Sequence, residues 1–487
     1  MVARRVRRSV SGAVSALGAM LLVLATAGTA LAVVPLTTVS TDPYTNTSSY
    51  HQTEVEPDTA SFGSTVVATF QVGRFSDGGS SNLGFATTTD NGTTWTNGFM
   101  PGTTVYANPP GTWARISDPS VAYDGKHDVW MVVGLVLDSG PSAHGLVVNR
   151  STDGGLTWQN PVNVSINQGG YDKQWMTCDD TATSTFYGNC YVEWAGNTGI
   201  TMSRSTNGGL SWANSSTPFA GGSGGQPVVQ NNGRVVVPYI GNGMQSLIST
   251  DGGAHYTGPN TIATAGDHFV AGSLRTELLP SAEVDGAGKI YLVWQDCRFR
   301  SGCSANDIVM TTSANGTTWT PVVRIPIDPV SSTFDHFIPG VDADNATQGN
   351  TAHLGLTFYL YPKANCSVST CKLQAGFISS QDGGTTWSRA MRLVGPMHLT
   401  WLPFTTLGYM VGDYISTSFG SNGKAYPVIP NATITPNCTQ SQLGSCHEFM
   451  VAPTNGLTLG ADVVRVNRND RAFPTAPRPI PRVLPLN

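Results

Sequence analysis

The chain has 487 residues, of which 12% are charged, and its formal net charge at pH 7 is −5. This charged share is about half of what a soluble domain usually carries. The small negative charge excludes the strong basic field that nucleic-acid-binding proteins use, so we expect no nucleic-acid partner. With 55 glycines, the composition favours an exported β-protein with many tight turns.

Residues 1–32 have the pattern of a secretory signal peptide. A basic start, Met1 to Arg8, is followed by an apolar stretch from about Ala13 to Ala30, and Ala30-Leu31-Ala32 resembles a cleavage site. An uncleaved membrane anchor is the alternative. No other apolar run in the sequence is long enough to span a bilayer. We therefore expect a secreted protein that is cleaved after Ala32 and leaves the membrane.

The cysteine content also indicates an oxidising compartment. An even number of cysteines in an exported chain suggests disulfides, and the eight fall into four pairs of near neighbours. A zinc site is the rival interpretation, but no pair has the Cys-x-x-Cys spacing and no histidine pattern completes one. We predict the disulfides Cys178–Cys190, Cys297–Cys303, Cys366–Cys371 and Cys438–Cys446.

One eight-residue motif occurs six times and dominates the interpretation. It reads approximately Ser/Thr-x-Asp-x-Gly-x-Thr-Trp, as in Ser151-Thr-Asp-Gly-Gly-Leu-Thr-Trp158. Repeats spaced by roughly 40–70 residues indicate an array of one supersecondary unit. The copies begin at Thr88, Ser151, Ser205, Ser249, Thr312 and Ser380.

Each residue type in the motif suits a β-hairpin turn. The Asp carboxylate can accept N–H groups of its own turn, Gly permits a positive φ, and Trp is a large apolar anchor. The third and fifth copies place Asn207 and Ala314 at the Asp position. We expect those two turns to be pinned less firmly or differently.

A second pattern, of short β-rich runs bounded by Gly and Asn, fills the space between motifs. It divides the chain into seven units of about four strands, each a candidate propeller blade. The units start near residues 52, 118, 175, 226, 281, 339 and 409. We predict an all-β, seven-bladed β-propeller over residues 33–463, with six blades as the alternative. The last unit lacks the motif, which fits a blade closed by strands from both chain ends. The Pro/Arg-rich residues 464–487 are expected to form an extended tail.

The motif is similar to the Asp box of bacterial neuraminidases and the wider sialidase superfamily. The resemblance implies a propeller whose Asp boxes lie on the rim, away from the active face. Asp boxes also occur in xyloglucan-cleaving enzymes, sortilin-like receptors and photosystem assembly factors, so the resemblance supports the fold more than the chemistry.

Sialidase chemistry, as the resemblance implies it, needs arginines for the substrate carboxylate, a Tyr nucleophile assisted by a Glu, and an Asp acid/base. The sialidase Arg-Ile-Pro is missing where the first unit begins, at Gln52 to Ala60. Phe70 to Asp77 looks like the segment that carries an Arg and the acid/base Asp. On this resemblance Arg74 is a substrate-binding candidate and Asp77 a catalytic one.

The remaining candidates rest on their position within a unit. Arg298 follows one strand and Arg275 precedes the same unit, so both are candidates for substrate binding. Glu283 is a candidate because it occupies a strand position where an apolar residue is expected. Tyr414 is the candidate nucleophile, with Asp413 or Glu283 beside it.

The resulting hypothesis is a secreted, monomeric, sialidase-like glycoside hydrolase. Its partner is an extracellular glycan, and its substrate is a terminal, acidic sugar. The alternative is a propeller that binds glycan or protein without chemistry, whose face would lack convergent Arg and carboxylate groups. We expect no cofactor and no metal centre. A structural calcium stays open, although Asp342-Ala-Asp344 does not continue as an EF-hand loop.

Overall fold

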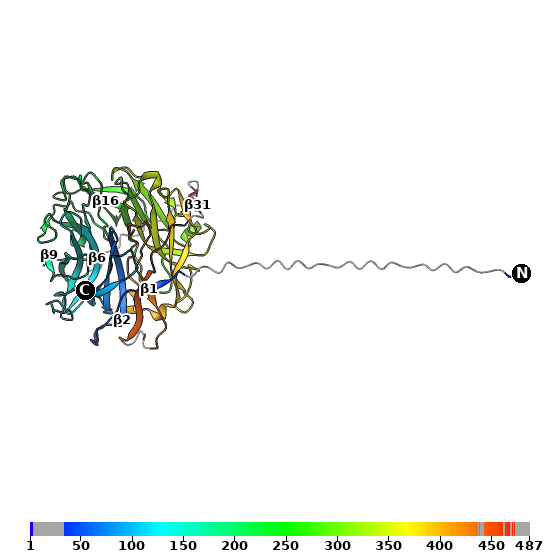
Figure 1. Ribbon diagram of the computed structural model, residues 1–487, viewed down its shortest axis with the longest axis horizontal. Helices are drawn as coiled ribbons and strands as arrows, with labels where there is room; N and C mark the ends of the chain where they lie inside the picture. The colour runs from blue at the N-terminus through cyan, green and yellow to red at the C-terminus, as the bar shows by residue number, and fades with distance from the viewer. Residues whose placement is uncertain are drawn as a thin grey trace. The chain divides into compact units, whose positions relative to one another are not determined.

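The structure is a computed structural model that describes residues 1–2, 34–436, 438, 443–460, 463–467, 470 and 472. The expected signal peptide falls almost wholly outside these residues. Within the compact unit Val33–Asn487, the described residues form 31 strands and three short 3-10 helices, Ser301–Cys303, Gly349–Thr351 and Leu399–Trp401. The all-β class is as predicted (Figure 1). No helix among the described residues is long and apolar enough to cross a bilayer.

Four separate sheets of four antiparallel strands follow one another along the chain. Each pairs its strands in sequence order, apart from one omitted strand in the fourth. The sheets are β10–β13 (Trp175–Cys178, Cys190–Gly196, Gly199–Ser205, Ala213–Asn214), β14–β17 (Val228–Val229, Val235–Gly241, Gly243–Ser249, Thr257–Ala263), β18–β21 (Ser281–Val284, Ile290–Asp296, Asp307–Ser313, Val323–Arg324) and β22, β23, β24 and β26 (Asp335–Ala343, Leu354–Tyr361, Leu373–Ser380, Met391–Met397).

Two further groups of four strands precede them and are joined into one larger sheet through the single pair Ser80–Ile116. Short β-rich runs bounded by Gly and Asn recur along the sequence, and each run forms one strand of a group. The groups are β2–β5 (His51–Phe62, Thr65–Arg74, Ser80–Thr88, Thr96–Phe99) and β6–β9 (Arg115–Asp124, Val129–Leu137, Ala143–Ser151, Val162–Ile166).

The two ends of the chain meet in the last group. Strand β30 (Ser445–Pro453) pairs with β29 (Ile429–Ala432) and with the N-terminal strand β1 (Leu36–Thr38). Its first residues also pair in parallel with the start of β2. On the inner side, Ser416 bridges to Val428. Strands from both chain ends therefore share one sheet.

Apolar side chains from successive groups interlock between the sheets. One cluster joins Met131 and Val148 of the second group to Val192 and Trp194 of the third. Another joins Tyr291 and Val293 of β19 to strands β22–β24. The core is therefore a series of layers between neighbouring sheets.

Five of the six motifs form the same turn. In these five, the Gly N–H at the fifth motif position donates to the hydroxyl of the first residue, at 3.0 Å for Gly155 and Ser151. The Asp153 carboxylate accepts from the Thr157 N–H at 2.9 Å and from the Ser151 hydroxyl at 2.8 Å. Gly155 has a φ of 79°, a backbone conformation that a residue with a side chain would resist.

Two motif copies differ from this arrangement. Asn207 accepts from the Ser211 N–H at 3.1 Å, but its amide donates to the Ser211 hydroxyl instead of accepting from it. In the fifth copy the residue that caps the turn is Asn315, not a residue at the Ala314 position. Asn315 accepts from the Thr318 N–H at 2.8 Å because this turn is one residue shorter. The expected gap at Ala314 is therefore filled by its neighbour.

The aromatic residue of each motif faces the protein interior. Trp387 is fully buried and Tyr256 nearly so. Trp158 is partly buried and its ring lies 5.8 Å from that of Phe85, in the preceding group. Trp95, Trp212 and Trp319 also pack at the edges of hydrophobic clusters.

The four disulfides join Cys178–Cys190, Cys297–Cys303, Cys366–Cys371 and Cys438–Cys446, the pairs that local spacing predicts. The expected tail differs in its first residues. Strand β31 (Val463–Arg465) pairs with β25 (Thr386–Ser388) and Val466 is buried against the core. The apolar Val463-Val464 pair makes this segment a strand, and most of the residues after 467 lie outside the described part of the chain.

We expect opposite effects from Asp153→Ala and Asn207→Asp. The first removes the acceptor for a backbone N–H in its turn and should destabilise the fold by about 1 kcal/mol. Asn207→Asp restores the carboxylate and should stabilise the fold by a few tenths of a kcal/mol. Chemical denaturation of both variants measures the two shifts. Equal effects of the same sign would contradict the proposed capping role.

Candidate functional site

The first strand of several groups carries a β-bulge with an unusual backbone. Glu56, Asp118, Lys173 and Ile338 have φ values of 57°, 49°, 55° and 49°. Glu56, Asp118 and Ile338 each lie in a bulge, two residues before the strand resumes its regular pairing, and Lys173 lies two residues before β10 begins. Positive φ at non-glycine residues is strained and concentrates at functional sites, and bulges redirect side chains. Three of these four positions carry ionisable groups.

Two of these residues, Glu56 and Lys173, contact Asp413 together with Arg275. The Arg275 Nε donates to Asp413 Oδ1 at 2.8 Å, and the Arg275 Nη2 and the Lys173 ammonium both contact Oδ2. Asp413 is buried. Burial alone would raise the pKa of Asp413, but Arg275 and Lys173 outweigh it and hold that pKa well below its usual value. Asp413 is therefore an ionised carboxylate between two cations.

A second buried carboxyl lies beside this ion-pair group. Glu56 Oε1 accepts from the Asp413 N–H at 3.1 Å, and Oε2 accepts from the Gln71 amide. Burial, aided by Asp118 and Asp413, raises the pKa of Glu56 to about 8. Neighbouring carboxyls with opposite pKa shifts are the arrangement that acid and base roles require.

Tyr414 completes the group. Its hydroxyl donates to the Pro119 carbonyl at 2.9 Å, and its ring meets Trp175 edge to face at 5.1 Å. Burial, followed by the nearby carboxyls of Glu56 and Asp118, raises the pKa of Tyr414 well above 10. The phenol therefore stays protonated unless a base takes its proton.

Asp172 and Glu277 form the more exposed side of the same group. The Lys173 ammonium lies 3.8 Å from Glu277, whose side chain is 33% exposed. Burial raises the pKa of Asp172 to about 7, while Lys173 opposes the shift. We call Glu56, Arg74, Asp118, Asp172, Lys173, Arg275, Glu277, Asp413 and Tyr414 the central charged cluster.

Arg74 belongs to this cluster but is already occupied. Its Nη1 donates to the carbonyls of Phe75 and Gly79 at 2.9 and 2.7 Å, and its Nε to the Met410 sulfur at 3.1 Å. Burial and the nearby Arg275 lower the pKa of Arg74 to about 10. Its visible role is to hold the turn after β3.

The structure brings four of the seven predicted residues together, namely Arg74, Arg275, Asp413 and Tyr414. Two others lie in ion pairs outside the cluster. Asp77 pairs with Arg115 at 2.6 Å, and Arg298 pairs with Asp296 at 2.6 Å. The Asp77 side chain is 38% exposed.

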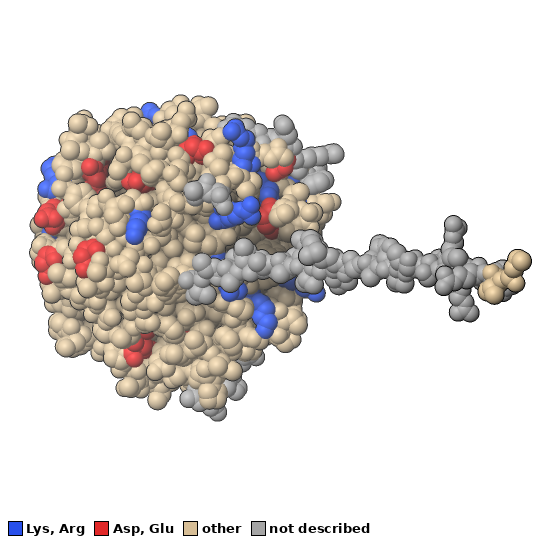
Figure 2. Space-filling view, turned by 45° about the vertical axis from the view of Figure 1, so that its right-hand side comes forward, with Lys and Arg blue, Asp and Glu red and all other residues tan. Residues whose placement is uncertain are grey.

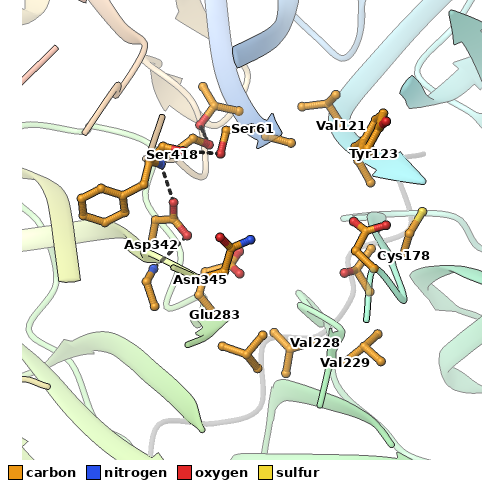
Figure 3. Close-up of a pocket in the computed structure, with 18 of the residues that line it drawn as sticks. Ser61, Val121, Tyr123, Cys178, Val228, Val229, Glu283, Asp342, Asn345 and Ser418 are labelled. Carbon is orange, nitrogen blue, oxygen red and sulfur yellow. Dashed lines mark hydrogen bonds between the residues drawn. The ribbon is translucent and has the colours of Figure 1, made fainter. Parts of the chain in front are cut away.

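Glu283, the seventh predicted residue, lines a different space. A cavity of about 400 Å³ is bounded by the inner strands of six groups and by residues 417–419. Figure 3 shows Glu283 and Asn345 on one side of it, facing Tyr123 and Cys178 on the other. Burial and the neighbouring Asp342 raise the pKa of Glu283 well above its usual value. The Tyr414 hydroxyl donates to the Pro119 carbonyl, so Glu283 is not its hydrogen-bond partner.

Trp175 links the two spaces. It lines the large cavity and also a small pocket of about 20 Å³ beside Lys173 and Tyr414. The cavity and the cluster therefore lie along the same inner strands, with the bulged residues at the end where those strands begin.

Five residues of the cluster were not predicted from the sequence, namely Glu56, Asp118, Asp172, Lys173 and Glu277. A signal was present for two of them, because Glu56-Pro57 and Asp118-Pro119 repeat at the start of their units. A charged residue before such a Pro marks the bulge in these groups. Lys173 is not followed by Pro, so its equivalence to Glu56 and Asp118 could be recognised only from the strand pairing in the structure.

One three-residue group has the spacing of a metal site. Asp307, Asp328 and His336 place ligand atoms within 4.8 Å of one another. Arg300 and Arg324 already pair with these two aspartates at 2.5–3.0 Å. Two guanidinium groups thus neutralise two carboxylates, which leaves no excess negative charge for a calcium ion.

Comparison with known proteins gives partial likenesses only. No family model and no curated protein matches the chain. Among solved structures, the phage phi92 endosialidase shares 12% identity over 91% of this chain and 71% of its own, with a TM-score of 0.49. A leech intramolecular trans-sialidase shares 12% identity over 70% of each chain (TM-score 0.45). A Dyadobacter fermentans protein of unknown function shares 15% identity over 72% of this chain and 99% of its own (TM-score 0.43). The architecture therefore rests on the chain's own sheets.

Proposed function

We propose that the protein is a secreted, monomeric, seven-bladed β-propeller that hydrolyses terminal sugars of extracellular glycans. Six four-stranded groups, plus a seventh built from both chain ends, supply the blades. Four disulfides suit an oxidising compartment. The resemblance of the repeated motif to the Asp box supports a glycan as the partner.

The observation that carries the proposal is the central charged cluster. The cluster brings together the ionised carboxylate of Asp413, the carboxyl of Glu56, whose pKa is raised, and the phenol of Tyr414. These groups come from two distant parts of the chain and lie in contact or near contact. A non-catalytic propeller face needs no such convergence of cations and carboxyls. Glycosidases do, because they stabilise a positively charged transition state and transfer protons.

Roles follow from burial and pKa. Tyr414 is the proposed nucleophile, with the ionised form of Glu56 as the acceptor of its proton. Asp172 is partly exposed and has a pKa of about 7, which suits a group that both gives and takes a proton. Asp77, at the rim, is the alternative acid/base. Asp172→Asn and Asp77→Asn distinguish them, because only the true acid/base variant should lose turnover.

Tyr414→Phe is expected to lower kcat by about 1,000-fold or more if Tyr414 attacks the sugar. The change removes one hydroxyl that donates to a backbone carbonyl, so the fold should survive. The measurement is fluorophore release from a panel of aryl glycosides. Tyr426→Phe is the matched control, because the Tyr426 hydroxyl also donates to a carbonyl, that of Asn91 at 2.7 Å. Full turnover by Tyr414→Phe would refute the nucleophile.

The second candidate is a glycan-binding propeller without catalysis. It is favoured by the commitment of Arg74 to backbone carbonyls and of the Tyr414 hydroxyl to Pro119. This candidate predicts retention on a glycan array with no sugar released from the retained glycans.

A further inference from the structure

The two arginines of the central charged cluster, and four arginines outside it, are already engaged within the chain. Arg275 pairs with Asp413, Arg115 with Asp77, and Arg298 with Asp296. Arg300 and Arg324 share Asp307 and Asp328. Arg74 donates to backbone carbonyls. Among the described residues of these loops, each guanidinium has an internal acceptor.

A substrate carboxylate would have to displace one of these acceptors. The place best suited to it, between Arg275 and Lys173, is held by Asp413. That carboxylate takes both donors of the Nε–Nη2 edge of the guanidinium and the ammonium as well. A paired guanidinium edge is the geometry that a free carboxylate seeks. Asp413 therefore stands where the carboxylate of an acidic sugar would bind.

Two cations of the cluster are already paired with its own carboxylates. Lys173 contacts Asp413 and lies 3.8 Å from Glu277, whose side chain is 33% exposed, so a second anion would lie close to existing negative charge. Like charges brought together in a partly desolvated site cost several kcal/mol of binding free energy. An incoming carboxylate would find both arginines of the cluster, Arg74 and Arg275, already engaged within the chain. Figure 2 shows few charged residues on the face it presents, where blue and red groups are scattered.

We infer that the sugar bound at the central charged cluster carries no carboxylate, because Asp413 supplies that charge from within the protein. The inference rests on the proposed function for the location of the site. It departs from the acidic substrate that the Asp-box resemblance implies. The substrate class is then a terminal neutral sugar, recognised through its hydroxyl groups by the carboxyls of the cluster.

The first test compares hydrolysis of aryl sialoside and aryl glucuronide with that of uncharged aryl hexosides and N-acetylhexosaminides. We expect kcat/KM for the two acidic substrates to be at least about 100-fold lower. A sialoside or glucuronide cleaved as well as the best neutral glycoside overturns the inference but leaves the proposed hydrolase intact. No turnover of any glycoside rejects the hydrolase, and the binding test then decides the inference.

The binding test uses acetate as the probe and needs no turnover. Asp413→Gly leaves a carboxylate-sized gap between Arg275 and Lys173, so acetate should raise its melting temperature by several degrees while acetamide should not. The wild-type protein should show no acetate response and no saturable binding of N-acetylneuraminate by calorimetry. Saturable binding by the wild type, or an Asp413→Gly variant indifferent to acetate, refutes the inference. If that variant does not fold, Asp413→Ala replaces it. This variant keeps the Cβ, so stabilisation by formate but not by formamide is then required.

Discussion

The free energy of unfolding is expected to fall as the pH rises from about 5 to about 9. Burial raises the pKa of Glu54 and of Glu56 to about 8, and that of Asp58 and of Asp342 to about 7. Between the unfolded pKa values near 4 and these folded values, the folded protein binds more protons than the unfolded chain. The stabilisation is therefore complete at acid pH and is lost as pH rises through the folded pKa values.

The total effect is on the order of 5 kcal/mol, since several buried carboxyls contribute together. Asp413 has the opposite sign. Its lowered pKa makes its contribution complete above the unfolded pKa and lost only in strong acid. Maximum stability should therefore lie at mildly acidic pH, between these two limits.

Urea denaturation at pH 5, 7 and 9 measures this dependence. Glu448→Gln is an informative variant, because Glu448 is buried with neither carboxyl oxygen hydrogen-bonded, next to Glu54. The amide cannot ionise, so the variant should gain stability relative to the wild type at pH 9 and much less at pH 5. A wild-type free energy of unfolding that stays level or rises from pH 5 to pH 9 would contradict the prediction.

Asp413→Ala is expected to destabilise the fold by about 3–5 kcal/mol at pH 7. The substitution leaves the ammonium of Lys173, which is 4% exposed, without its nearest carboxylate, and Arg275 without its paired acceptor. Removing one partner of a buried ion pair costs this much because the remaining charge is neither solvated nor paired.

A second substitution separates charge from packing. Lys173→Met fills similar space without the charge, so the double variant Asp413→Ala with Lys173→Met should recover part of the loss. Both variants are measured by chemical denaturation in low and high salt. Additive losses in the double variant would show that packing, rather than the unpaired ammonium, accounts for the cost.

The sequence predicted the fold well where it carries local, repeated chemistry. Each motif caps its own turn through contacts within a few residues, and each disulfide joins near neighbours, so neither depends on the distant course of the chain. The unit starts near residues 118, 175 and 281 lie on the first strands β6, β10 and β18 for the same reason. The fifth motif was misread at Ala314 because a one-residue deletion is invisible without the turn itself.

The site was predicted less completely, since it depends on contacts between distant strands. Arg275 and Asp413 could be proposed from their place in a unit, but their pairing joins residues 138 positions apart. Lys173 and Asp413 are 240 positions apart. Glu283 broke the apolar pattern of its strand as expected, yet it faces the large cavity. A polar residue at an apolar strand position indicates a polar environment for its side chain, but it does not tell which cavity or cluster the side chain lines.

The pairing of β1 with β30 in one sheet constrains the order in which the protein can fold during its synthesis. The Thr37 and Thr454 hydroxyls lie 2.8 Å apart although 417 positions separate them. Bringing such remote segments together is slow compared with forming hairpins. The individual sheets can therefore assemble during synthesis, while the N-terminal strand waits for nearly the whole polypeptide to emerge. A nascent chain, or one truncated before Ser445, would leave β1 without its partner strand, and such an unpaired edge is a ready template for association with another copy.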